Sequence, residues 1–128
     1  MRNLLLASVL ALGAAALPGC LLVAGAAIGA GIVYASSDDT AEVRLRTTTA
    51  AAYAAAREEV LVRGTVESSD PKSGVLEGKI GSTSVRVTVV AESDGMVKVS
   101  VKARSNSGLS PDMDTANQVT VAVVKRIG

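Results

Sequence analysis

The sequence predicts an α+β fold, a two-layer sandwich in which an antiparallel sheet carries two helices on one face. Two patterns support this prediction: apolar and polar residues alternate in short stretches between residues 40 and 104, and two longer segments have the features of helices. Most of the strands follow one another between the helices, so both helices are expected on the same side of the sheet. An apolar N-terminal region precedes this domain.

Five strands are predicted. Residues 40–46, 84–91 and 96–104 alternate with a period of two, which places the apolar side chains on one face of each strand, and residues 65–69 and 75–80 are short candidates on either side of a turn. Residues 70–74, between the second and third strands, include the proline and glycine that a turn favours. Residues 93–95 read Ser-Asp-Gly and separate the last two strands, which is a strong hairpin signal. The predicted strands are residues 40–46, 65–69, 75–80, 84–91 and 96–104.

Two helices are predicted from their ends and their composition. Residues 50–63 are rich in alanine, follow three threonines that can cap a helix, and stop at Gly64. Residues 112–127 open with acids and close with two basic residues, the polarity that a helix dipole favours. The many β-branched residues of the second segment leave a closing strand as the alternative. Residues 106–111 are expected to be a polar connection.

The composition excludes several functions. The formal net charge is +1, and without Arg2 of the N-terminal region 12 basic residues balance 12 acidic ones, so binding to nucleic acid is not expected. Tyr34 and Tyr53 are the only aromatic residues, too few to stack on bases or sugars. The chain has no histidine and one cysteine, which removes disulfides, histidine bases and the usual zinc ligands. We expect no metal and no cofactor.

Carboxylates are the remaining candidates for catalysis, and their positions do not favour it. Glu58 and Glu59 are neighbours in the first predicted helix and point in different directions. Asp112 and Asp114 suit the start of the second helix, where acids interact favourably with the helix dipole. We therefore predict no catalytic residues and a protein that is not an enzyme.

Residues 1–19 have the order of regions of a secretory signal peptide, with a short basic start, an apolar stretch and a small residue before Cys20. Leu17-Pro18-Gly19-Cys20 resembles a lipobox, in which the cysteine thiol accepts lipid such as palmitate before the signal is cleaved. Pro18 departs from the small or β-branched residue that is usual at its position. The alternative is a transmembrane span over residues 4–34, which Pro18 and Gly19 would interrupt.

Residues 20–39 are expected to form the lipidated cysteine and a Gly/Ala-rich tether, and residues 40–128 a small α+β domain. Lipid chains anchor a protein without a spanning helix, because each buried methylene contributes about 0.8 kcal/mol. Leu21 follows the cysteine in place of the aspartate that retains such lipoproteins in the inner membrane, so a periplasm-facing position on the outer membrane is favoured. Gly25 and Gly29 form a GxxxG pair, which leaves a membrane-associated assembly protein as the alternative.

The order of these features resembles a family of small bacterial lipoproteins classed as domain of unknown function 3568. The resemblance rests on the lipobox ending at Cys20, the Gly/Ala-rich run to Tyr34, the alanine-rich helix around Tyr53, and the strands around Val85 and Val97. It covers nearly the whole chain. The family implies a lipid-anchored envelope protein, and it brings no known activity or catalytic residues.

The sheet face that no helix covers is the main candidate site of the predicted domain. Valines at alternate positions must face the helices, so the basic residues between them share the opposite face, with Glu42 and Glu77 among them. The candidate binding face comprises Arg44, Arg46, Arg86, Lys98, Lys102 and Arg104.

These patterns favour a non-enzymatic binding or structural module of the bacterial cell envelope, held by its lipid anchor. Its open face would bind an anionic envelope partner or a protein. The simpler alternative is that these charges are the solvated side of a half-exposed sheet. The two differ in salt response, because an electrostatic binding site loses affinity as ionic strength rises.

Overall fold

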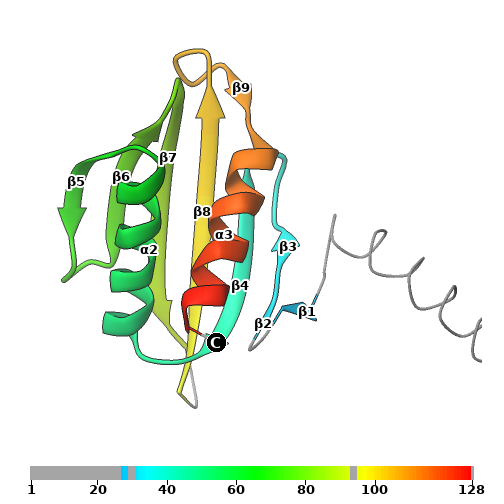
Figure 1. The fold of residues 1–128 in the computed structure, drawn as a ribbon. Helices are drawn as coiled ribbons and strands as arrows, with labels where there is room; N and C mark the ends of the chain where they lie inside the picture. Colours follow the sequence, from blue (N-terminus) through cyan, green and yellow to red (C-terminus); the bar gives the residue numbers. More distant parts are fainter. Residues whose placement is uncertain (1–26, 29–30, 93–94, 128) are drawn as a thin grey trace, which may run out of the picture.

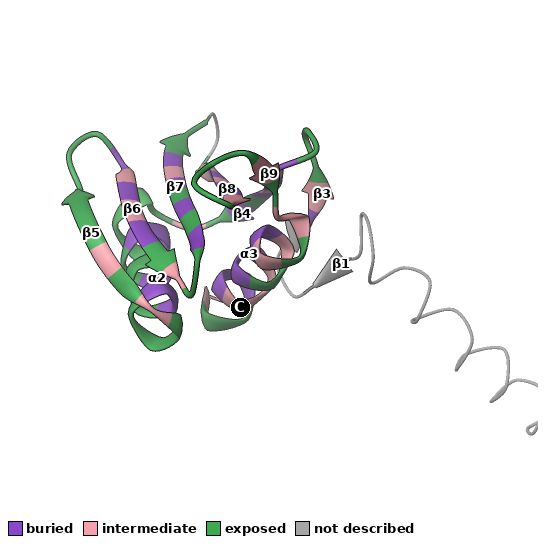
Figure 2. Ribbon diagram, turned by 90° about the horizontal axis from the view of Figure 1, so that it is seen from above, coloured by how far each residue is buried: buried purple, intermediate pink, exposed green. Residues whose placement is uncertain are grey.

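The computed structural model describes residues 27–28, 31–92 and 95–127, and within them it confirms the predicted two-layer α+β sandwich. A seven-stranded antiparallel sheet forms one layer. Helices α2 (Thr49–Arg63) and α3 (Met113–Ile127) form the other layer and lie on the same side of the sheet (Figures 1 and 2).

The strands of the sheet follow the order β3-β4-β8-β7-β6-β5, and β9 pairs with the end of β8. The chain leaves β4 near one edge, passes through α2 to β5 at the opposite edge, and returns strand by strand until β8 lies beside β4 (Figure 1). β1 (Ala27–Ile28) and β2 (Gly31–Ile32) pair with each other outside this sheet. The strands of the sheet are β3 (Tyr34–Ala35), β4 (Thr40–Arg46), β5 (Thr65–Asp70), β6 (Val75–Ile80), β7 (Thr83–Ala91), β8 (Met96–Ser105) and β9 (Ser110–Pro111).

The core lies between the sheet and the helices and consists mostly of valine and alanine. The central strand β8 shows the pattern, because Val97, Val99 and Val101 are buried and face the helices. Gly78 of β6 allows α2 to approach closely, since a Cβ there would lie 2.7 Å from Cγ1 of Val60 and 2.3 Å from a backbone oxygen. Small residues at these positions bring the two layers together.

Local signals set the ends of both helices. The Thr48 side chain accepts a hydrogen bond from the Ala51 amide, which caps α2 as the threonine run predicts, and Gly64 follows its last residue. Asp112 accepts a hydrogen bond from the Thr115 amide at the start of α3. The second segment is the predicted helix and not the alternative strand, because its buried valines recur at helical spacing.

Four short strands, β1, β2, β3 and β9, lie where the sequence analysis expected none, and β1 pairs with β2 within the expected tether. β3 pairs with β4, and Val33, the residue before β3, is buried. The sheet and the core therefore begin N-terminal to Thr40, within the segment that was expected to be the tether. β9 forms within the expected polar connection of residues 106–111. Strands of two residues are too short to show an alternating period, which explains why the sequence pattern misses them.

Within the described ranges, no helix is long and apolar enough to cross a membrane.

Candidate functional site

The open face of the sheet, on the side away from α2 and α3, carries all of the predicted basic residues. Alternation along each strand places them there, opposite to the buried valines. The strand register sets Arg44 directly opposite Lys98, and Arg86 directly opposite Lys102. The structure thus brings together on one face the residues Arg44, Arg46, Arg86, Lys98, Lys102 and Arg104.

Arg104 forms contacts within the fold. Its guanidinium donates hydrogen bonds to Oδ2 of Asp39 at 2.6 Å and to the Gly108 carbonyl oxygen at 2.7 Å. Hydroxyl groups of Thr40 and Ser37 also donate to the buried Asp39 carboxylate. Hydrogen bonds from Thr40, Ser37 and Arg104 hold the pKa of Asp39 well below its ordinary value. Arg104 therefore joins the turn before β4 to the loop after β8.

Arg44 is also engaged, in a polar network on the open face. It donates to Oε1 of Glu92 at 2.6 Å and to the Tyr34 hydroxyl at 2.9 Å, and its guanidinium lies over the Tyr34 ring. The Tyr34 hydroxyl and Ser100 Oγ in turn donate to the two carboxylate oxygens of Glu42. Partial burial acts to raise the pKa of Glu42, but hydrogen bonds from Tyr34 and Ser100 outweigh it, so the pKa lies below its ordinary value.

The side chains of the other four predicted cations are more available to a ligand. Arg86 lies 3.5 Å from a Glu77 oxygen, and its side chain is 57% exposed. Lys102 lies 4.0 Å from Oδ2 of Asp39, and its side chain is 53% exposed. Arg46 and Lys98 form no ion pair within 4 Å with any residue that the structure describes. The accessible positive charge of the face therefore lies on Arg46, Arg86, Lys98 and Lys102, together with Lys79, which is exposed on the same face of β6.

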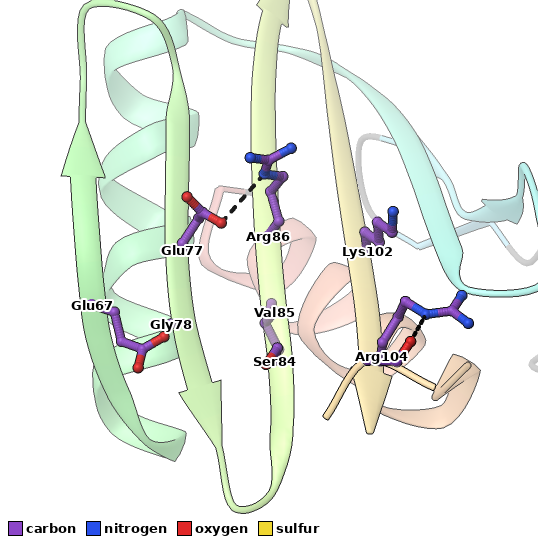
Figure 3. A pocket seen from close by; sticks show the side chains of 9 residues that line it. Glu67, Glu77, Gly78, Ser84, Val85, Arg86, Lys102 and Arg104 are labelled. Carbon is purple, nitrogen blue, oxygen red and sulfur yellow. Dashed lines mark hydrogen bonds and ion pairs between the residues drawn. The ribbon is translucent and has the colours of Figure 1, made fainter. Parts of the chain in front are cut away.

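A hollow of about 260 Å³ occupies one end of the open face (Figure 3). Its lining combines both signs of charge with a serine hydroxyl and the glycine of the loop after β8. Gly78 has no side chain and the Val85 side chain is buried toward the helices, so these two residues offer backbone to the hollow. The lining residues are Glu67, Glu77, Gly78, Ser84, Val85, Arg86, Lys102, Arg104 and Gly108.

The carboxylates that were considered for catalysis lie in the helical layer. Glu59 accepts hydrogen bonds from Arg63 of its own helix and from Arg126 of α3. Burial acts to raise the pKa of Glu59, but the two arginines lower it by more. Asp112 accepts from the hydroxyls of Thr83 and Thr115. Glu59 thus links two helices and Asp112 caps one.

No group of three or more histidine, cysteine, aspartate or glutamate residues that could hold a metal ion occurs in the described part of the chain. The lipobox residues Leu17, Pro18, Gly19 and Cys20 lie outside the described residues, as do Gly25 and Gly29.

The sequence analysis placed Glu42 and Glu77 on the open face but did not identify two other anionic partners, Asp39 and Glu92. Asp39 was assigned to the tether, and Glu92 was given no role, yet each binds an arginine of the open face. The one sequence signal at these positions is the polar run from Ser36 to Asp39, and such a run indicates a domain boundary, not a contact with the sheet. Alternation predicts which face a residue occupies, but it carries no information about partners from loops.

A scan against models of protein families finds no match to this chain, and a search of curated proteins finds none either.

Proposed function

We propose that this chain is a lipoprotein of the bacterial cell envelope, related to the family that its sequence resembles, and that it is not an enzyme. Lipid on Cys20 holds it at a membrane, facing the periplasm and preferably on the outer membrane. Its domain binds an anionic envelope partner through the open face of the sheet. The lipobox pattern supports the anchor, and the geometry of the open face supports the binding function.

One observation carries the binding function: two pairs of like charges lie directly opposite each other on neighbouring strands of the uncovered face. The pairs are Arg44 with Lys98 and Arg86 with Lys102. Each such pair destabilises a sheet by roughly 0.2–1 kcal/mol. Nothing in the core requires these cations, because their side chains point away from it. Glu92 beside Arg44 and Glu77 beside Arg86 offset part of the repulsion. A bound anion would relieve the rest, which favours an anionic partner over a merely solvated surface.

The anchor is tested by feeding labelled palmitate to bacteria that express the full chain. We expect label on the wild type and none on Cys20→Ala, whose precursor should accumulate because the acyl acceptor is absent. Pro18→Ser is the matched control, since it restores the usual residue at that position and should keep the label. Normal labelling of Cys20→Ala would overturn the anchor.

The binding function is tested with the full chain in nanodiscs of neutral phosphatidylcholine and with polyphosphate as a soluble anionic probe. We expect binding that weakens about tenfold or more as salt rises to physiological strength. The triple variant Arg46→Gln, Lys98→Gln, Lys102→Gln should lose this binding.

A matched triple variant removes the same number of charges from other parts of the surface: Arg57→Gln, Lys72→Gln, Lys125→Gln. It should bind as the wild type does. If both triple variants lose binding equally, net charge and not the open face attracts the probe, and the proposal fails.

A further inference from the structure

The hollow on the open face separates its charges by sign. Its cations come from β7 and β8, and its acids Glu67 and Glu77 come from β5 and β6 (Figure 3). Glu77 faces Arg86 across the two central strands of the hollow, while Glu67 lies farther out toward the sheet edge (Figure 3). A ligand that matches this lining carries an anionic group at one end and a cationic group at the other.

Four side chains that lie side by side on two neighbouring strands surround the place where the anionic end of the ligand would bind. Ser84 lies opposite Arg104, and Arg86 lies opposite Lys102. Side chains in such positions are about 5 Å apart at their Cβ atoms, so one small anion can contact several of them. Arg104 is held by Asp39 and Gly108, which leaves the cations Arg86 and Lys102 and the Ser84 hydroxyl for the ligand. Two cations and a hydroxyl suit a phosphate, which has more oxygen acceptors to satisfy than a carboxylate.

Glu67 is the residue that would contact the cationic end of the ligand. A β-bulge places it at the hollow. The register between β5 and β6 shifts between Val66 and Ser68, so Glu67 has no partner residue on β6. Bulges re-aim a side chain out of the regular alternation. Glu67 forms no hydrogen bond or ion pair with any side chain that the structure describes, which leaves its carboxylate able to accept N–H groups from a ligand.

A strained loop supplies one wall of the hollow. Asn106 and Ser107 both have positive φ angles, 53° and 58°, which residues with a side chain rarely adopt, and Gly108 follows at 88°. Arg104 holds this loop by donating to the Gly108 carbonyl oxygen. Residues kept in such conformations occur preferentially at ligand sites, because the surrounding structure must stabilise them.

We propose that this hollow binds a phosphoethanolamine group, with the phosphate against Arg86 and Lys102 and the primary ammonium against Glu67. β5 and β7 are two strand spacings apart, about 10 Å, so the charges of the ligand must be separated by several bonds, as the phosphate and ammonium of phosphoethanolamine are. The amino groups of the Arg86 guanidinium remain available to the phosphate, because the Glu77 contact is made by Nε of Arg86. This inference rests on the proposed binding function of the open face and names the ligand chemistry at one end of it.

The test is calorimetric titration of the full chain in nonionic detergent micelles with O-phosphoethanolamine, inorganic phosphate and phosphocholine. We expect phosphoethanolamine to bind about tenfold more tightly than either of the others, because inorganic phosphate lacks the ammonium and phosphocholine has no N–H to donate. Glu67→Gln should abolish this preference and leave the affinity for inorganic phosphate unchanged. Lys102→Gln should weaken both ligands.

Lys125→Gln is the matched control, because Lys125 lies on α3, outside both the open face and the hollow, and this variant should bind all three probes as the wild type does. A preference that survives in Glu67→Gln would overturn the proposal, as would equal binding of the three probes. If polyphosphate still binds the wild type in that case, the function of the open face stands and only this ligand assignment fails.

A fourth probe, glycerophosphoethanolamine, distinguishes two sources of the same group. Tight binding of this diester assigns the site to phospholipid headgroups. Binding of the monoester alone assigns it to phosphoethanolamine attached to other envelope molecules. Both results support the hollow as the site, and both require the loss of preference in Glu67→Gln.

Discussion

The two faces of the sheet come from the same strands and differ in what constrains them. On β8, Val97, Val99 and Val101 are buried beneath the helices, whereas Lys98 and Lys102 alternate with them on the open face. The buried face has one requirement, which is to fill the space under α2 and α3 with apolar volume. The open face is free of that requirement, so its charged residues can either stabilise the fold through ion pairs or remain available for binding.

The open face itself divides into two parts. In one part the charged groups satisfy one another, as Arg44 does with Glu92 and Arg104 with Asp39. In the other part, around the hollow and along the middle of β8, the charges are half exposed or without an ion-pair partner among the described residues. The first part strengthens the fold, and the second is the part that can bind.

The largest difference between the faces should follow from placing a carboxylate on each. Val99→Asp puts an unpaired charge in the centre of the core and should destabilise the domain by more than about 4 kcal/mol, enough to unfold it. Thr88→Asp places the same side chain on the open face of β7 and should leave the domain folded. Circular dichroism spectra and thermal melts of both variants measure this contrast, and a folded Val99→Asp would contradict the assignment of the buried face.

Removing Asp39 should have the next largest effect. Asp39→Ala leaves Arg104 without its carboxylate and should destabilise the domain by about 2–3 kcal/mol, less than for a fully buried pair because Arg104 is partly exposed. Asp38→Ala changes the exposed neighbour and should shift stability by under about 0.5 kcal/mol. Chemical denaturation of the two variants gives both values. Equal effects would show that the Asp39 contact does not join the turn to β8.

Acid should weaken the fold through the same carboxylate. The pKa of Asp39 is lowered in the folded chain from its ordinary value of 3.8, so the unfolded chain binds more protons as the pH falls through that value. Stability is therefore full above about pH 5 and declines below it, by about 1 kcal/mol between pH 5 and 3 from this group alone. Asp39→Asn should show a flatter decline in denaturation midpoints. A parallel decline in wild type and variant would assign the acid sensitivity to other carboxylates.

The smallest effect on stability is expected for a cation in the part of the open face that we propose binds the partner. Lys98→Gln removes the repulsion with Arg44 and also a charge near Glu42, so the free energy of unfolding should change by less than about 0.5 kcal/mol. Urea denaturation measures the change. A loss above about 1 kcal/mol would mean that Lys98 serves the fold.

The buried face could be predicted from the sequence more completely than the open face. Alternation over seven residues sets the bounds of β4, because burial on one face requires that period. β3 and β9 are too short to show it. The candidate binding residues could be assigned to a face, but the contact of Arg104 with Asp39 could not be anticipated, because Asp39 reaches it from a turn 65 residues away in the chain.

Lysine footprinting tests the central claim, that the open face is the binding surface, and it works even while the partner is unidentified. Acetylation rates of Lys98 and Lys102 on the open face are compared with those of Lys72 and Lys125, which lie outside it, in intact cells and in the purified full chain. We predict that Lys98 and Lys102 are protected several-fold in cells and become reactive on purification, while Lys72 and Lys125 react equally in both. Equal reactivity of all four lysines in both settings would contradict the account.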